Sequence, residues 1–293
     1  MTTRTVLITG AGRGIGRAVS VHLARAGWRV FAGVRTDIAA QQLAAESAMI
    51  TPVELDVTVH EHLDTLGSLL PERLDALINN AGIAVPGPLE TLSRGEMHHQ
   101  FDVNVVGPLA LTRAVLPRLR RARGRVVFIS SINGRVSFPF TGMYNASKYA
   151  IEAVADCLRV ELFPFGIQVA LVEPGVIDTD PWHQMDELLD DLEGDLAPEL
   201  KALYAPHFAG EHRLVGNIRK NAKPPEQVAL AIERQLTRSR MRPRSLVGAD
   251  ARSIVAMKSL LPARGLDAVW RQGLGLRQDL APRDPRVAVA PGR

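Results

Sequence analysis

The chain of 293 residues is long enough for one large α/β domain or two small ones. Hydrophobic residues make up 46% and charged residues 23%, which is typical of a globular protein and excludes an extensively disordered chain. The formal net charge is +4. Because the basic residues form no stripe interleaved with aromatic side chains, we do not expect a nucleic-acid-binding function.

The N-terminal residues and the cysteine content indicate where the protein is found. The start, "MTTRTVLITGAG", lacks the apolar core of about 7–15 residues that a signal peptide has, and no window reaches ~18 consecutive apolar residues. The single cysteine, Cys157, excludes an intramolecular disulfide and a CxxC motif. The helical pattern around it predicts a buried, structural thiol. We therefore expect a cytoplasmic protein without a transmembrane segment, and leave peripheral contact of a loop with a membrane open.

The first 175 residues alternate short apolar runs with longer helical patterns. Such alternation is typical of a parallel sheet that is covered by helices on both faces. The predicted strands are 5–9, 29–34, 51–57, 74–82, 124–131 and 166–175. The predicted helices are 14–27, 38–47, 60–70, a long region over 93–121 that Gly107 and Pro108 interrupt, and a helix over Tyr144 that ends near Phe163.

The pattern becomes looser after residue 180. Acidic and leucine residues over 180–222 predict short amphipathic helices outside the sheet, which form a lid over a substrate pocket. A helix over 224–239, a strand over 244–251 and helical spacing over 252–276, consistent with packing on the sheet edge, complete the domain. Residues 281–293 are predicted to be a mobile tail rich in proline and arginine.

These elements predict an α/β fold: a single-domain, Rossmann-like, doubly wound parallel sheet of about seven strands with helices on both faces. The single domain spans 1–280, since no internal repeat or linker divides the chain. Sheets of this kind bind ligands beyond the carboxyl ends of their strands.

A glycine-rich loop, "TGAGRGIG", joins the first strand to the first helix. It has Gly10, Gly14 and Gly16 at GxxxGxG spacing, and Ile15 occupies the position of the third glycine of the GxGxxG fingerprint. Glycines let the backbone approach a pyrophosphate that lies against the N-terminus of the following helix. We therefore expect a dinucleotide site formed by Gly10, Arg13, Gly14, Ile15 and Gly16.

The end of the second strand favours NADP(H). A carboxylate at this position binds a ribose 2′-hydroxyl, whereas arginine binds a 2′-phosphate. Here Val34 takes the carboxylate position, and Arg35 follows it. Arg13 could reach the same phosphate, and two guanidiniums suit a phosphate dianion. NAD(H) remains possible because a shift of the strand end would bring Asp37 near the ribose, although we expect Asp37 to cap the next helix.

The stretch "GMYNASKYAIEAV" places Tyr144 four residues before Lys148, on one helix face. Hydride transfer to a carbonyl needs a proton donor, a cation beside it and a polar group on the carbonyl oxygen. Tyr144, Lys148 and Ser131 supply these three groups. The Lys148 ammonium and the nicotinamide charge are expected to lower the pKa of Tyr144 from about 10.

Taken together, "TGAGRGIG", "NNAG", "DVNVVGP", Ser131, "YNASK" and "PGVIDT" occur in the order found in short-chain dehydrogenases/reductases, so that residues 4–180 resemble this family. The resemblance implies that Ser131 orients the substrate and that Asn104 holds a water in a proton relay to Lys148. It further implies that Asp56 contacts the adenine and Asn80 the adenosine ribose, and that Lys148 touches the nicotinamide ribose. Ile177, through its backbone, and Thr179, through its hydroxyl, would hold the carboxamide.

The segment that runs from Phe138 to Gly175 is similar to the branch that contains 17β-hydroxysteroid and retinol dehydrogenases. This similarity implies a lipophilic secondary alcohol or carbonyl compound as substrate. An acyl-chain ketoreductase, an NAD-dependent alcohol dehydrogenase and a non-catalytic dinucleotide sensor remain as alternatives. The resemblance also implies a homodimer or homotetramer. No metal site is expected, because His98 and His99 are adjacent and do not share a helix face.

Overall fold

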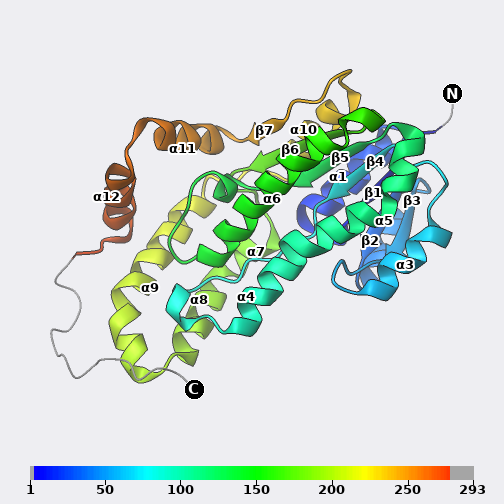
Figure 1. Cartoon of the computed structure of the whole chain (residues 1–293). Coiled ribbons are helices and arrows are strands. Elements are labelled where there is room, and N and C mark those ends of the chain that lie inside the picture. The colour runs from blue at the N-terminus through cyan, green and yellow to red at the C-terminus, as the bar shows by residue number, and fades with distance from the viewer. Residues whose placement is uncertain (1–2, 278–293) are drawn as a thin grey trace.

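The fold is described from a computed structural model, in which residues 3–277 are placed. Seven parallel strands form one sheet in the order β3-β2-β1-β4-β5-β6-β7 (Figure 1). The strands are β1 (Thr5–Ile8), β2 (Arg29–Val34), β3 (Ile50–Glu54), β4 (Ala76–Asn79), β5 (Arg125–Ile129), β6 (Gln168–Pro174) and β7 (Arg244–Val247). The predicted doubly wound α/β sheet is therefore confirmed.

The helices of the sheet layers begin and end close to the predicted positions. They are α1 (Gly14–Arg25), α2 (Asp37–Glu46), α3 (His60–Leu69), α4 (Arg94–Phe101), α5 (Gly107–Ala122), α6 (Gly142–Glu161) and α10 (Glu226–Thr237). A π-helical turn, Asp102–Val106, separates α4 from α5, so the predicted interruption at Gly107 starts five residues earlier.

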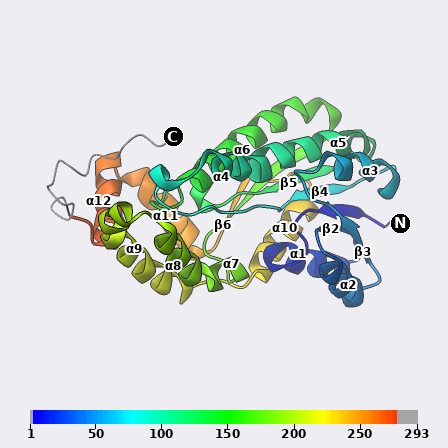
Figure 2. The same cartoon turned by 90° about the horizontal axis from the view of Figure 1, so that it is seen from below.

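Helices cover both faces of the sheet (Figure 2), and an apolar layer lies between the sheet and the helices on each face. Alternate residues of a strand point to opposite faces, and in β1 Val6 and Ile8 belong to one layer while Leu7 belongs to the other. Helices α1, α2 and α10 cover the first face, and α3, α5 and α6 cover the second. Burial on both faces explains why the strands are continuous apolar runs in the sequence.

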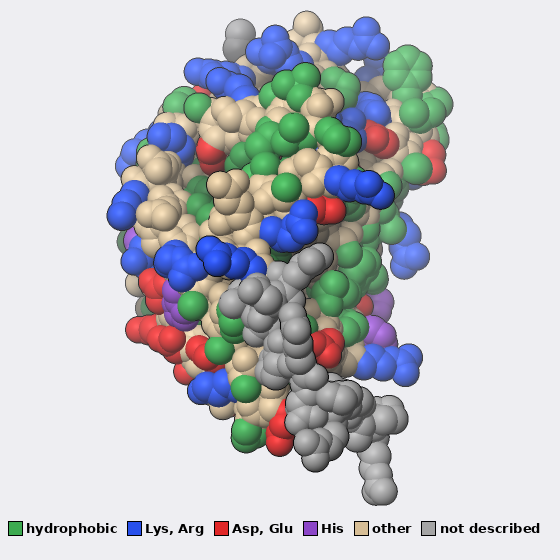
Figure 3. All heavy atoms as spheres, turned by 90° about the vertical axis from the view of Figure 1, so that its left-hand side faces the viewer, with side chains coloured by type: hydrophobic (Ala, Val, Ile, Leu, Met, Phe, Trp, Pro, Cys, Tyr) green, Lys and Arg blue, Asp and Glu red, His purple; other side chains and the backbone are tan. Residues whose placement is uncertain are grey.

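A third group of helices lies beyond the carboxyl ends of the strands, on the left of Figure 1. It contains α7 (Asp180–His183), α8 (Met185–Asp195), α9 (Pro198–Arg219), α11 (Ala249–Leu260) and α12 (Ala263–Leu274). Phe140, Leu189, Phe208 and Val215 form its buried apolar core. Figure 3 views the molecule from this end, where hydrophobic side chains lie among Lys and Arg side chains.

Several expectations about these elements are wrong. Helix α9 has 22 residues, so residues 180–222 do not form only short helices. Helix α12 packs on α9 rather than on the sheet edge, whereas α11 contacts β7. Strand β7 ends at Val247, because Gly248 has a φ of 107° and α11 follows at once. The predicted tail, 281–293, lies outside the described residues.

Cys157 is also misassigned by the sequence pattern. Its side chain is exposed on α6, whereas a buried thiol was expected. The buried face of α6 carries Lys148, Ile151, Glu152, Ala155 and Leu158. Successive helix positions are about 100° apart, so residue 157 turns away from the face that residues 151, 155 and 158 share.

Candidate active site

The glycine loop turns between β1 and α1 at the carboxyl edge of the sheet. Gly10 and Gly14 have φ values of 62° and 52°, which residues other than glycine rarely adopt. A Cβ atom at Gly16 would lie 2.2 Å from the Gly10 carbonyl oxygen. The loop therefore forms a cradle that only glycine permits, and it opens on the N-terminus of α1. This cradle fits the pyrophosphate of a dinucleotide.

Asn80 holds the loop in place from the end of β4. Its Nδ2 donates to the carbonyl oxygens of Thr9 at 2.8 Å and Gly10 at 3.1 Å, and its backbone N–H donates to the Thr9 hydroxyl at 2.9 Å. β1 and β4 are neighbours on either side of the point where the strand order reverses. Asn80 therefore lies at the edge where doubly wound sheets bind their ligands.

Arg35 follows β2 directly, since this strand ends at Val34 as expected. Its side chain is 65% exposed, and its Nη1 lies 3.7 Å from Asp56 Oδ2. Arg13 is exposed as well, at the N-cap position of α1. Both cations can thus turn toward an anionic ligand at this edge. Asp37 does not cap α2, because Thr36 occupies the N-cap and its hydroxyl accepts from the Ala39 N–H at 3.3 Å.

Local hydrogen bonds favour the ionised form of the Asp56 carboxyl group. Burial raises the pKa of Asp56, but the N–H and hydroxyl of Thr58 bind Oδ1 at 2.9 and 2.7 Å. Together with the charges of Arg35 and His62, these bonds bring the pKa below its usual value. A fixed carboxylate that accepts hydrogen bonds suits an amino group of a ligand.

The loop after β6 carries Ile177 and brings Thr179 to the glycine loop. A Cβ atom at Gly14 would lie 3.1 Å from Thr179 Cγ2. Ile177 pairs with Lys223 in an isolated β-bridge, and the N–H of the neighbouring Asp178 donates to the Lys223 carbonyl at 2.8 Å.

Asp250 fixes the same loop and was missed by the sequence analysis. Its Oδ2 accepts from the Val176 N–H at 2.8 Å, and a Cβ at Gly175 would lie 2.1 Å from that oxygen. The available signal was the pattern "VGADA", in which an acidic residue follows a strand and a glycine.

Tyr144 and Lys148 lie on one face of α6, as their spacing predicts. Lys148 is 6% exposed, its Nζ donates to the Ile129 carbonyl at 2.9 Å, and this nitrogen lies 5.6 Å from the centre of the Tyr144 ring. Burial lowers the pKa of Lys148 to about 8, against the opposing charge of Glu152. An ammonium group is thus held beside the phenol, and no carboxylate of the described residues forms an ion pair with it.

The decrease in the pKa of Tyr144 was expected from the Lys148 ammonium and the nicotinamide charge together, and Lys148 alone does not produce it. Burial raises this pKa, and hydrogen bonding with Ser131 only partly offsets the effect. The Lys148 ammonium is directed to a carbonyl rather than to the phenolic oxygen, and burial disfavours the phenolate. In the chain by itself, Tyr144 is therefore a neutral phenol that can donate a proton.

Asn104 lies in the π-helical turn and reaches the same region. Its side chain accepts from the Ile83 N–H at 2.9 Å and donates to the Ile83 carbonyl at 2.9 Å and to Ser147 Oγ at 3.0 Å. Asn104 Oδ1 and Lys148 Nζ would lie 3.4 and 3.7 Å from a Cβ placed on Gly82. The amide therefore anchors the segment after β4 and lies close to Lys148.

Ser131 caps a short 3₁₀ helix (Ile132–Gly134) just after β5. Its hydroxyl donates to Asn133 Oδ1 at 3.1 Å and accepts from the Asn133 N–H at 3.2 Å, while Asn133 Nδ2 donates to Asn145 Oδ1 at 2.7 Å. Asn133 and Asn145 were missed by the sequence analysis. Their positions, two residues after Ser131 and one after Tyr144, were the only signal.

Within residues 3–277, no group of three or more His, Cys, Asp and Glu side chains is arranged to bind a metal ion. Over the same residues, no helix combines the length and the apolar character needed to span a membrane.

Known proteins share this architecture. Residues 4–189 match a family model described as short chain dehydrogenase. Retinol dehydrogenase 5 of Mus musculus is 35% identical over 278 residues, which cover 90% of this chain and 86% of the mouse protein.

Two solved structures superimpose along nearly the whole chain. A short-chain dehydrogenase from Streptomyces avermitilis has 31% identity and a TM-score of 0.74, with 93% of this chain and 95% of the other covered. A short chain dehydrogenase from Burkholderia cenocepacia in complex with NADP has 26% identity and a TM-score of 0.71, with 92% and 97% covered. With its glycine cradle and its tyrosine–lysine pair on α6, the chain belongs to the short-chain dehydrogenase family and is an NAD(P)-dependent oxidoreductase.

Proposed function

We propose that the protein transfers a hydride between NADP(H) and a secondary alcohol or carbonyl group of a lipophilic substrate. The observation that carries this proposal is the grouping of Ser131, Tyr144 and Lys148 at the carboxyl end of β5. The name of the mouse relative, a retinol dehydrogenase, supports a lipophilic substrate.

In carbonyl reduction the bound cofactor supplies the hydride from its nicotinamide ring. Tyr144 donates its phenolic proton to the carbonyl oxygen, while the Ser131 hydroxyl leaves Asn133 and donates a hydrogen bond to the same oxygen. Lys148 stabilises the phenolate that remains, and Asn104 holds the water through which the phenol regains its proton. Alcohol oxidation runs through the same groups in the opposite order.

The dinucleotide is held by Gly10, Gly14, Ile15 and Gly16 at the pyrophosphate. Asp56 and Asn80 contact the adenosine, and Ile177 and Thr179 contact the carboxamide. Arg13 and Arg35 favour a 2′-phosphate because both are exposed cations at the edge of the cradle. The NADP complex of the Burkholderia protein supports this preference.

Residues 180–222 form the substrate lid in this proposal. Their buried apolar core includes Phe140, which precedes the catalytic helix, and Phe208 of α9, whose rings meet edge to face at 5.2 Å. We also propose that copies of the chain pair through α5 and α6. The proposed location is the cytoplasm, a reducing compartment that suits a single free cysteine.

Turnover with NADPH and NADH tests the proposal on a panel of retinoids, steroids and acyl thioesters. We expect reduction of a retinoid or steroid carbonyl with NADPH as the better cofactor, and we expect Arg35→Ala to remove that preference. Arg238→Ala is the matched control, since Arg238 is an exposed arginine at the C-cap of α10. Equal use of NADH by the unchanged protein would contradict the NADP(H) assignment. Reduction of acyl thioesters alone would contradict the substrate class.

A further inference from the structure

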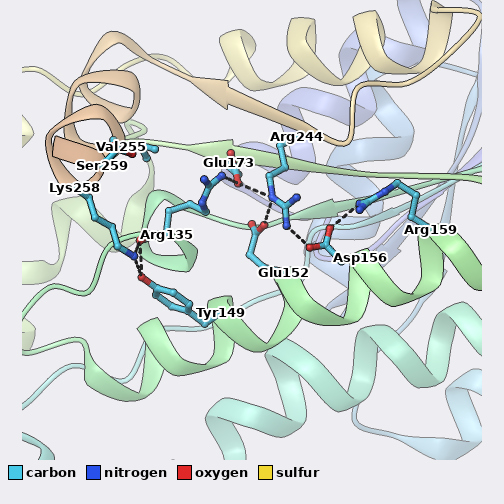
Figure 4. A network of polar contacts seen from close by, with 10 residues as sticks. All are labelled: Arg135, Tyr149, Glu152, Asp156, Arg159, Glu173, Arg244, Val255, Lys258 and Ser259. Atoms are coloured by element: carbon cyan, nitrogen blue, oxygen red, sulfur yellow. Dashed lines mark hydrogen bonds and ion pairs between the residues drawn. The ribbon is translucent and has the colours of Figure 1, made fainter.

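A cluster of charged side chains joins α6, β6 and β7 (Figure 4). Two of its members, Glu152 of α6 and Glu173 of β6, are 5% and 0% exposed. Removing carboxylates from water is costly unless cations and hydrogen bonds compensate them. Neither residue takes part in the chemistry described above, so their burial needs another explanation.

Two arginines compensate the buried pair. Arg244 of β7 donates from Nε to Glu152 Oε2 at 2.8 Å, and the same nitrogen lies 3.6 Å from Glu173 Oε1. Arg135 donates from Nη1 to Glu173 Oε1 at 3.1 Å. Compensation is incomplete, because Glu152 Oε1 and Glu173 Oε2 are buried without a hydrogen-bond partner in the described part of the chain.

Glu152 lies on the same buried face of α6 as Lys148. Glu152 follows Lys148 by one helical turn, and a Cβ on Gly134 would lie 3.0 Å from both Glu152 Cγ and the Lys148 carbonyl oxygen. The same Cβ would lie 2.8 Å from Ser130 Oγ. The absence of a side chain at Gly134 thus lets Glu152 pack against the turn that carries Ser131.

We propose that Glu152 is a positioning residue for proton transfer at Tyr144: its buried carboxylate, held by Arg244 and packed beside Glu173, keeps Lys148 in its ammonium form. The proposal rests on the proposed function, in which the ammonium stabilises the phenolate. A buried lysine tends to lose its proton, and an anion within the same low-dielectric region opposes that loss.

The other charged groups around Lys148 are less suited to this task. Asp156 and Arg159, further along α6, pair with each other at 2.7 Å, and Asp156 is 40% exposed. From the α4 side, the neutral Asn104 faces Lys148. On α11, Lys258 bonds Tyr149 and the Arg135 carbonyl. Glu173 is directed to Arg135, and burial and the Glu152 charge raise its pKa, which weakens it as an anion.

The protonation of Lys148 can be measured without any substrate. The sequence contains five lysines, so a protein labelled with ¹³Cε-lysine gives few signals: Lys148, Lys201, Lys220, Lys223 and Lys258. The Lys148 signal is assigned by its loss in Lys148→Met, and its shift is followed with pH. We expect Glu152→Gln to lower the pKa of Lys148 by about 1 unit. The glutamine oxygen can still accept from Arg244, so the fold should be retained.

Three variants separate the charge of Glu152 from the packing around it. Asp156→Asn removes the other carboxylate that Arg244 binds, at 2.7 Å, and should leave the pKa of Lys148 unchanged. Glu152→Asp keeps a carboxylate and should retain most of the wild-type pKa of Lys148. This variant remains informative even if Glu152→Gln folds poorly. Glu173→Gln should change the pKa of Lys148 less than Glu152→Gln does. An unchanged pKa in Glu152→Gln, or an equal decrease in Asp156→Asn, would overturn the proposal.

The pH profile of kcat provides the second test. In Glu152→Gln the alkaline limb of carbonyl reduction should move to lower pH by the same amount as the NMR titration, with KM unchanged. A decrease in kcat that is the same at every pH would indicate a structural role only and would also overturn the proposal. Wild-type protein that turns over no substrate would contradict the proposed function, whereas the NMR titration would still decide the role of Glu152.

Discussion

At the scale of single residues, the site depends on a neutral phenol at position 144. Replacing Tyr144 by Phe removes the hydroxyl but keeps the ring that packs 5.6 Å from Lys148 Nζ. Because the proton donor is lost while the cradle is untouched, kcat should decrease by about 10²–10⁴-fold. Steady-state rates and NADPH titration by fluorescence measure this, and the dissociation constant for NADPH should hardly change. Retained turnover would mean that another group donates the proton.

Asn133 is predicted to orient Ser131. In Asn133→Ala the Ser131 hydroxyl loses the acceptor at 3.1 Å that fixes its rotamer, so kcat should decrease by about 10-fold, or roughly 1.4 kcal/mol of transition-state stabilisation. A double-mutant cycle with Ser131→Ala provides the control. Because both changes act through one hydroxyl, Asn133→Ala should have little further effect in the Ser131→Ala background. Additive losses would show that Asn133 acts by another route.

At the scale of elements, the junction of β1 with α1 tolerates no side chain at Gly16. A Cβ there would lie 2.2 Å from the Gly10 carbonyl and 2.6 Å from Asn80 Nδ2. Gly16→Ala should therefore destabilise the protein by about 1–3 kcal/mol and abolish dinucleotide binding. Gly67→Ala in α3 is the matched control, because no atom lies within 4 Å of its Cβ, and it should stabilise by roughly 0.5–1 kcal/mol. Urea unfolding and NADPH titration measure both effects.

Helix α9 carries a buried carboxyl group, Glu211, and burial raises its pKa to about 7. The unfolded pKa is lower, near 4.5. The native state thus retains a proton between these values that the unfolded state has lost, so stability should fall as pH rises from 4.5 to 7 and then level off. Glu211→Gln should remove the contribution of Glu211 to this loss and be more stable than the wild type by on the order of 1–3 kcal/mol at pH 8.

Urea unfolding at pH 4.5 and pH 8 checks this expectation. The control is Glu187→Gln, a change in the neighbouring helix α8 at an exposed position. This control should follow the wild-type curve at both pH values. A Glu211→Gln variant with the same pH dependence as the wild type would show that Glu211 is not the responsible group.

At the scale of the whole molecule, the sequence predicts those features that depend on residues close together along the chain. The strands could be recognised because both faces of the sheet are buried, and the Tyr144–Lys148 spacing fixes one helix face. The orientation of Ser131 by Asn133 could not be predicted from the sequence, because it depends on the rotamers of both side chains. The contact of Arg244 with Glu152 joins residues 92 positions apart, and no local pattern records it. In the protein alone, the pKa of Tyr144 depends on burial more than on the nearby Lys148 charge, and no sequence pattern records that burial.

Arg244 links separate parts of the fold, since it joins the edge strand β7 to α6 and faces Glu173 of β6. Arg244→Met would remove the positive charge that offsets the buried carboxylates of Glu152 and Glu173. This change should lower the free energy of unfolding by about 3–5 kcal/mol at pH 8. The loss should become smaller as pH falls, because burial and the Glu152 charge raise the pKa of Glu173, and protonation removes the uncompensated charge.

Unfolding in urea at pH 8 and pH 5.5 measures the cost of Arg244→Met. Arg159→Met is the control, because Arg159 pairs with the partly exposed Asp156, and a pair of this kind contributes about 0–1 kcal/mol. The triple variant Glu152→Gln, Glu173→Gln, Arg244→Met removes the buried charges together and should recover most of the stability at pH 8. A loss that stays the same at both pH values and persists in the triple variant would instead assign the role of Arg244 to the packing of its aliphatic stem between α6 and β7.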